Sequence, residues 1–224
     1  MRIRSITATA GLAVAALLLT ACGSDSPLEG KTGEEVAAAA ADALEEAGAV
    51  HIAGTMTQDG EEMEIDLQLQ GDDAAGTLTF GGTEVEIISV GGEQFLRAPV
   101  EFWAGFGMPE EALGMFDGTW VLMPAEAAAE FDTFSLAGFA DELRDPDGEI
   151  EEETRSEELD GEPVRVVEQE DGSTLTVADD DPAYPLELTG EEGSEGTVTF
   201  SGYGEEEDIS APEDALDLDE MMGA

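Results

Sequence analysis

Cysteine, histidine and basic side chains are nearly absent from this sequence. Of its 224 residues, one is cysteine, one is histidine and seven are lysine or arginine, against 55 aspartates and glutamates. A lone cysteine excludes an intramolecular disulfide, and no histidine–cysteine cluster offers a zinc site. We therefore expect a fold held by burial and hydrogen bonds alone, with no metal and no other cofactor.

The shortage of basic residues leaves a formal net charge of −48. A surface this acidic repels phosphate backbones, which excludes nucleic acid as a partner, and it repels anionic lipid head groups for the same reason. Because 42% of the residues are hydrophobic, a folded chain is nevertheless expected. We interpret the charge as an adaptation to saline surroundings.

Catalytic motifs are also missing. The sequence has no G-x-S-x-G elbow, and its carboxylate pairs are so numerous that none stands out as a general acid and base. The single histidine, His51, alternates with Val50 and Ile52 and is expected on the exposed face of a strand. We predict that the protein is not an enzyme.

Long hydrophobic runs are limited to Ile6 to Leu19, which is shorter than the roughly 20 residues that span a bilayer. Arg2 and Arg4 precede this run and small residues follow it, as in a secretory signal. The sequence Leu19-Thr20-Ala21-Cys22 resembles the lipobox of bacterial lipoproteins. That resemblance implies cleavage before Cys22, acylation of its thiol, and anchoring to the outer face of the cytoplasmic membrane. The alternative is an ordinary signal peptide with a free thiol.

Four segments follow from these signals. Residues 1–21 are the expected signal peptide, 22–31 a flexible Gly/Ser/Pro tether, 32–210 one folded domain and 211–224 an acidic C-terminal tail. Thr32 and Glu35 form a capping box that predicts a helix ending at Gly48.

From Val50 onward the hydrophobic period changes to two. Runs around residues 50–56, 63–70, 76–80, 85–90 and 95–96 are separated by Asp-Gly, Gly-Asp or Gly-Gly pairs, which predicts an antiparallel meander. Ile87-Ile88 interrupts the alternation and suggests a bulge. Short strands resume between residues 150 and 201. The fold class is therefore α+β, with an open, strongly curved antiparallel sheet of about ten or eleven strands and helices over its concave face.

The segments between the two groups of strands carry most of the aromatic residues and several methionines. These side chains could line an apolar cavity under the helices, or they could fill a core with no ligand. Gaps at Gly54, Gly76 and Ala74 favour empty volume. The candidate lining residues are Phe102, Trp103, Phe106, Met108, Leu113, Met115, Phe116, Trp120, Phe131, Phe134 and Phe139.

The layout resembles the LolA-like fold, and more closely the LppX/LprG-type lipoproteins of actinobacteria. The matching stretches, besides the lipobox, are 50–54 (VHIAG), 76–79 (GTLT), 101–103 (EFW), 118–121 (GTWV) and 183–186 (AYPL). The resemblance implies an open half-barrel with helices over its mouth.

Members of that family are lipid-binding or lipid-carrier lipoproteins. The resemblance thus implies a lipid or acyl-chain ligand and an unidentified protein donor or acceptor. The acidity of this chain argues against a ligand with a bare anionic head group. A tethered protein-interaction module without a lipid ligand is the alternative.

Overall fold

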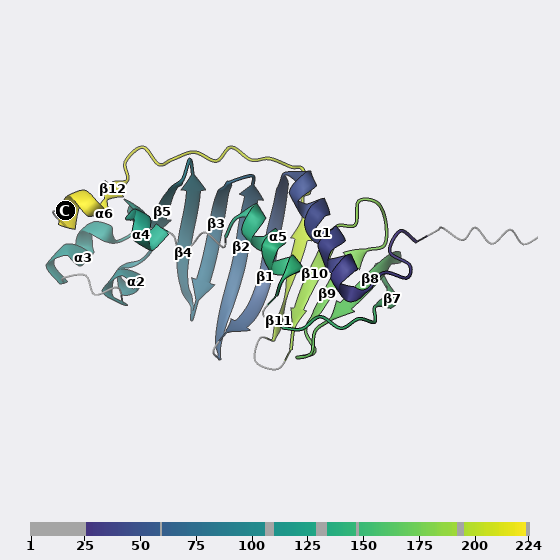
Figure 1. Cartoon of the computed structure of the whole chain (residues 1–224). Coiled ribbons are helices and arrows are strands. Elements are labelled where there is room, and N and C mark those ends of the chain that lie inside the picture. The colour runs from purple at the N-terminus through teal and green to yellow at the C-terminus, as the bar shows by residue number, and fades with distance from the viewer. Residues whose placement is uncertain are drawn as a thin grey trace, which may run out of the picture.

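The fold is seen in a computed structural model that describes residues 26–58, 60–105, 110–128, 134–146, 148–191 and 195–222. Its centre is one open sheet of twelve strands in the order β12-β6-β5-β4-β3-β2-β1-β11-β10-β9-β8-β7, with β12 and β7 at the two edges (Figure 1). Neighbouring strands are antiparallel except for β12, which runs parallel to β6. The predicted α+β class with an open antiparallel sheet is confirmed.

Two meanders build the sheet. The first contains β1 (Ala49–Gln58), β2 (Glu61–Gln70), β3 (Asp73–Phe80), β4 (Thr83–Val90), β5 (Glu93–Arg97) and β6 (Trp120–Leu122). The second contains β7 (Arg155–Leu159), β8 (Glu162–Glu168), β9 (Thr174–Ala178), β10 (Pro185–Gly190) and β11 (Gly196–Ser201). Strand β11 pairs with β1 and so joins the two halves.

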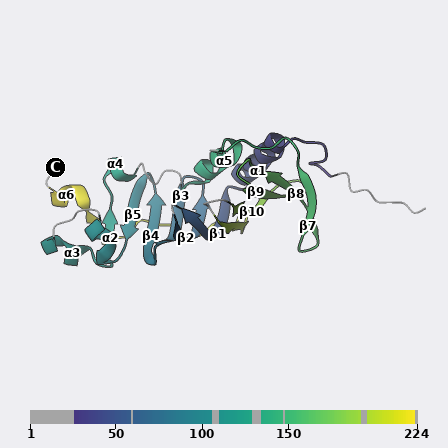
Figure 2. The same ribbon diagram turned by 90° about the horizontal axis from the view of Figure 1, so that it is seen from below.

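Helices α1 (Gly33–Ala47) and α5 (Leu136–Arg144) lie side by side on one face of the sheet, which we name the inner face (Figure 2). The alternating apolar residues of the strands point to this face, and Val50, Ile52, Leu67 and Leu78 are fully buried there. Helices α2 (Val100–Gly105), α3 (Glu110–Phe116), α4 (Ala125–Ala128) and α6 (Leu218–Met222) gather at the β5–β6–β12 end (Figure 1).

The capping box predicted for α1 is present. The Thr32 hydroxyl accepts a hydrogen bond from the Glu35 amide at 3.3 Å, and the Glu35 carboxylate accepts one from the Thr32 amide at 2.9 Å. Gly48 ends the helix in the left-handed conformation, with φ of 73°. The helix buries Val36, Leu44 and a stripe of alanines against the sheet, since small side chains allow a close approach.

The inner-face glycines do not leave empty volume, contrary to the expectation from the sequence. A Cβ atom on Gly54 or Gly76 would lie 2.1 or 2.0 Å from the carbonyl oxygen of Thr197 or Asp66 on the adjacent strand. These positions have φ of 156° and 151°, which favours glycine. Neighbouring backbone therefore occupies the space. The nearby Ala74 is itself buried in the core.

The predicted bulge at Ile87-Ile88 is wrong. The register of β4 with β3 and β5 runs through both residues without a shift, and the irregularity lies instead at Pro185–Glu187 in β10. Ile88 breaks the alternation because it pairs across the strands with Phe95 on the outer face, where Phe95 is buried.

The first described residues of the expected tether contact the body closely. Leu28 is buried, and its amide donates to Asp179 at 3.2 Å. The Ser26 hydroxyl donates to the same carboxylate at 2.6 Å, and Arg165 contacts both groups at 3.0 Å. This part of the segment is therefore fixed at the ends of β8 and β9.

The segment expected as a tail also takes part in the fold. Leu216 and Asp217 form β12 beside β6, and Leu218 is buried. The residues leading to β12 run across the strand ends of the first meander (Figure 1), where the side-chain amides of Gln68 and Gln70 donate to the Glu205 and Glu207 carbonyls at 2.7 and 2.9 Å.

Candidate ligand-binding site

An apolar hollow of about 320 Å³ lies between α5, the start of α1 and the second meander; we name it the α5 hollow. Its walls are mainly hydrophobic side chains of the inner face, with a few polar groups. The lining residues are Ala37, Met56, Phe139, Glu142, Leu143, Pro146, Gly148, Ile150, Val167, Gln169, Asp171, Ser173, Leu175, Leu188, Thr189 and Gly190. Small-ligand pockets begin at about this volume and are mostly apolar in the same way.

Helix α5 covers this hollow because its sequence is amphipathic. Leu136, Ala140 and Leu143, spaced by four and three residues, are buried toward the sheet. Ser135 caps the helix by accepting a hydrogen bond from the Gly138 amide at 3.1 Å. Phe139 packs edge-on against Phe200 of β11, with ring centroids 6.5 Å apart, and also lines the hollow.

An arginine fixes α5 to α1. Arg144 donates to Asp42 at 2.9 Å and also pairs with Glu45, both on α1. Hydrogen bonds to Glu45 and Asp42 raise the pKa of Arg144 above its ordinary value. Helices α5 and α1 are thus joined by ion pairs of Arg144, which stays positively charged.

A second apolar hollow, of about 510 Å³, lies between α2 and strands β3 and β4; we name it the α2 hollow. Phe80, Val85, Ile87 and Phe102 supply most of its wall. Phe80 is 40% exposed, which is unusual for a large aromatic side chain in this protein. An exposed aromatic beside an apolar hollow is a feature of binding surfaces.

The residues predicted from sequence divide between these hollows and the core. Phe139 lines the α5 hollow and Phe102 the α2 hollow. Trp103 and Phe116 are instead buried against one another with centroids 5.5 Å apart, and the Trp103 indole donates to the Ala98 carbonyl at 3.2 Å. The cluster between α2 and α3 therefore has the filled-core arrangement.

Other predicted positions lie outside both hollows. Leu113 and Phe134 are partly buried against the core, and Met115 is 51% exposed. Trp120 lies under the Arg97 guanidinium, 4.9 Å from the ring centroid. The predicted Phe106, Met108 and Phe131, and the predicted acylation site Cys22, lie outside the described residues.

Most walls of the α5 hollow were missed by sequence reasoning. Val167, Leu175 and Leu188 sit on β8, β9 and β10, and Ile150 pairs with Gln169 beside them. In the sequence Leu175 and Leu188 alternate with polar residues, whereas Val167 directly follows Val166. Nothing in that alternation distinguishes a strand that packs on a helix from one that borders an open volume.

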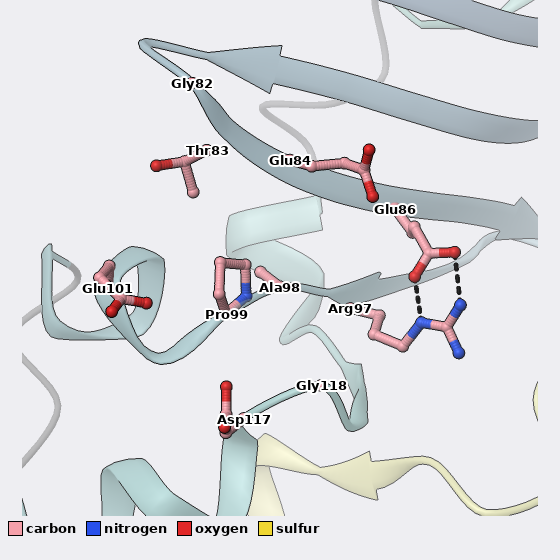
Figure 3. A pocket seen from close by; sticks show the side chains of 10 residues that line it. All are labelled: Gly82, Thr83, Glu84, Glu86, Arg97, Ala98, Pro99, Glu101, Asp117 and Gly118. Atoms are coloured by element: carbon pink, nitrogen blue, oxygen red, sulfur yellow. Dashed lines mark hydrogen bonds and ion pairs between the residues drawn. The ribbon is translucent and has the colours of Figure 1, made fainter.

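A more open pocket of about 650 Å³ lies where the β3–β4 turn, the β5–α2 junction and the α3–β6 junction meet (Figure 3). Its side chains are chiefly acidic: Glu84, Glu86, Glu101 and Asp117. Glu86 forms a two-pronged ion pair with Arg97, and this contact raises the pKa of Arg97 (Figure 3). A pocket of this charge does not suit an acyl chain.

The only histidine lies on the outer face, as expected. Its ring nitrogens lie 2.9 Å from Asp66 Oδ1 and 3.4 Å from Ser201 Oγ. The three residues sit on adjacent strands of an exposed face and line none of the pockets described above.

Within the described part of the chain, no cluster of histidine, cysteine or carboxylate side chains is arranged to hold a metal ion. The helices in that same part are all too short or too polar to cross a membrane.

Comparison with known proteins identifies the fold. No family of known proteins matches the sequence, and no curated protein matches it either. Among solved structures, LprF from Mycobacterium bovis aligns with 82% of this chain and 99% of its own, at 13% identity and a TM-score of 0.52. The Mycobacterium tuberculosis lipoprotein LppX aligns with 80% of this chain and 98% of its own, at 12% identity and a TM-score of 0.50. The chain has the fold of these two proteins, which confirms the LppX/LprG-type resemblance at the level of structure.

Proposed function

We propose that this protein is an exported lipoprotein that binds or carries a lipid or other acyl-chain ligand in the α5 hollow. It is anchored to the outer face of the cytoplasmic membrane through an acylated Cys22. The observation that carries the proposal is an apolar volume beneath a helical cover, in a fold shared with the lipoprotein LppX.

The hollow suits an acyl chain because its walls are mainly hydrophobic side chains, against which a chain can be buried without forming polar contacts. Each methylene transferred from water to such a wall contributes about 0.8 kcal/mol. Leu175, Leu188 and Val167 form one wall and Phe139 and Leu143 the other. The rim carries the carboxylates of Glu142 and Asp171, which disfavour an anionic head group at the mouth.

Native mass spectrometry of the purified protein tests the lipid ligand, together with extraction and analysis of whatever co-purifies. We expect a bound lipid, and uptake of a hydrophobic fluorescent dye once that lipid is removed. Leu188→Trp fills the hollow from a partly buried position and should reduce dye uptake severalfold. Thr199→Trp, on the outer face of the neighbouring strand β11, is the matched control and should leave dye uptake unchanged.

A tethered protein-interaction module is the alternative function. It predicts protein that is recovered without lipid and fails to bind the dye. If Leu188→Trp and Thr199→Trp had the same effect on uptake at equal melting temperature, the dye would not report the α5 hollow and the proposal would lose its main support.

The anchor is tested separately. Metabolic labelling with a radioactive fatty acid should mark the wild-type protein and place it in the membrane fraction, whereas Cys22→Ser should be unlabelled and released. Labelling that persists in the serine variant would contradict acylation at this residue.

A further inference from the structure

The α2 hollow shares two wall residues with the pocket of Figure 3, which we name the acidic pocket. Thr83 and Glu101 line both cavities, so the two volumes meet between the β3–β4 turn and the first turn of α2. Along β4, Val85 lines the hollow, whereas Glu84 and Glu86 line the acidic pocket. Successive side chains of a strand point to opposite faces of its sheet. An apolar cavity and an acidic one therefore lie on opposite faces of β4 and meet at its first residue.

The apolar cavity exposes an aromatic side chain. Phe80 is the one aromatic residue among the large apolar side chains that are exposed in the described part of the chain. Beside it, Phe102 packs edge-on against the buried Trp103 ring, with centroids 5.3 Å apart. The hollow thus has a wall held in place by the core and a second wall whose apolar surface a partner can cover.

The acidic pocket keeps two carboxylates available for an incoming cation. Glu86 is neutralised by Arg97, and Asp117 Oδ1 accepts a hydrogen bond from the first amide of α2 at 3.2 Å. None of the ion pairs in the described part of the chain includes Glu84 or Glu101, and both side chains are exposed. Uncompensated negative charge therefore lies directly beside the apolar hollow.

We propose that these two cavities form the docking site for a partner protein that carries a basic residue directly beside a large apolar residue. Neighbouring side chains of an extended peptide point to opposite sides. The apolar side chain enters the α2 hollow, while the basic one reaches Glu84 and Glu101 around the end of β4. A net charge of −48 speeds the encounter with a basic partner and repels a second copy of this chain.

The position of the site leaves it accessible to such a partner. Ser26 and Leu28 are bonded to Asp179 at the ends of β8 and β9, near one edge of the sheet, whereas α2 lies toward the other edge (Figure 1). A chain anchored before Ser26 therefore carries the site at the end far from its anchor. The inference goes beyond the proposed function, because docking needs no lipid in the α5 hollow.

Fluorescence anisotropy of a labelled decapeptide that alternates leucine with lysine tests the site, in salt of about 0.15 M. Two reference peptides replace leucine by serine or lysine by glutamate. We expect the leucine–lysine peptide to bind at least about tenfold more tightly than either, because burial of one leucine side chain is worth about this factor. The serine–lysine peptide measures what charge alone contributes.

A substitution in the hollow should remove the contribution of leucine. Phe80→Ser should weaken the leucine–lysine peptide about tenfold and leave the serine–lysine peptide within about twofold. Met115→Ser changes an exposed apolar residue of α3 that lines neither cavity, and as the matched control it should alter neither affinity. Melting temperatures establish that each variant is folded.

A charge change in the acidic pocket provides a second test at exposed positions. Glu84→Gln combined with Glu101→Gln should weaken the leucine–lysine peptide about fivefold, as expected for the loss of two exposed ion pairs. Glu151→Gln combined with Glu153→Gln removes the same charge at exposed positions before β7 and should change the affinity less than about twofold.

Equal losses from the two glutamine pairs would show binding to the acidic surface as a whole and would overturn the docking site. Unchanged affinity in Phe80→Ser would also overturn it, as would equal binding of the leucine–lysine and serine–lysine peptides to the wild-type protein. Leu188→Trp should reduce dye uptake and leave the peptide unaffected; loss of both would place the peptide in the α5 hollow and overturn the inference. Peptide binding by a wild-type protein that takes up no dye would overturn the proposed function alone.

Discussion

Arg165 and Asp179 form an ion pair inside the protein, with Arg165 Nη2 3.0 Å from Asp179 Oδ2 and only 11% and 3% of their side chains exposed. The same carboxylate accepts hydrogen bonds from the Ser26 hydroxyl and the Leu28 amide. One buried charge pair thus joins β8, the end of β9 and the segment that precedes α1.

Removal of one partner should be strongly destabilising. Asp179→Ala leaves the Arg165 charge buried without a counter-ion, and we expect the free energy of unfolding to fall by about 3–5 kcal/mol. Asp180→Ala, next to it but exposed, is the control and should change stability little. Urea unfolding followed by tryptophan fluorescence measures both. A loss below about 1 kcal/mol in Asp179→Ala would show that solvent reaches the pair.

Gly76→Ala should disrupt the pairing of β3 with β2 in the first meander. The new Cβ would lie 2.0 Å from the Asp66 carbonyl oxygen, so β3 must move away from β2. We expect a loss of about 1–3 kcal/mol in unfolding free energy. The control is Gly105→Ala, where the Cβ meets nothing within 4 Å and φ is not positive. Equal stability of the two variants would contradict the close approach of the strands.

Tyr203 should make stability fall at high pH. Burial raises the pKa of its hydroxyl above the ordinary value, and the group donates to the Pro185 carbonyl while its ring stacks on Tyr184 with centroids 4.0 Å apart. The unfolded state ionises near pH 10 and the folded state does not. The stabilisation is therefore complete below pH 10 and is lost as pH rises above it.

Unfolding free energies measured between about pH 9 and 11.5 test this, because they straddle the ordinary tyrosine pKa. Tyr203→Phe should be less stable than wild type at the lower pH and should show a shallower decline. Parallel pH curves for the two proteins would assign the decline to other groups.

Salt should stabilise the protein. A net charge of −48 makes the compact state repel itself, and screening shortens the range of this repulsion from about 10 Å at 0.1 M to about 3 Å at 1 M. We expect the melting temperature to rise steadily as sodium chloride increases over this range. A melting temperature that does not change would show that the carboxylates are spaced too widely to matter.

The sequence predicted the helix at Thr32–Gly48 and the first meander because capping and turn residues act locally. It predicted Phe102, Phe139 and Trp103 alike as lining residues; Phe102 and Phe139 border the hollows, whereas Trp103 is buried in the core. An aromatic residue in a helical segment looks the same whether it fills a core or borders a hollow. The difference is set by how far α2 and α5 stand from the sheet, which depends on contacts such as Arg144 with Asp42 across about 100 residues.

The position of β12 has a consequence for how the chain is made. Strand β6 pairs with β5 on one side, but its other side stays unpaired until Leu216 and Asp217 have been synthesised. The β6 border of the sheet is therefore completed only after the other strands of the sheet have been synthesised, which delays completion of the fold. A premature stop shortly before Leu216 would leave that border open to pairing with another molecule.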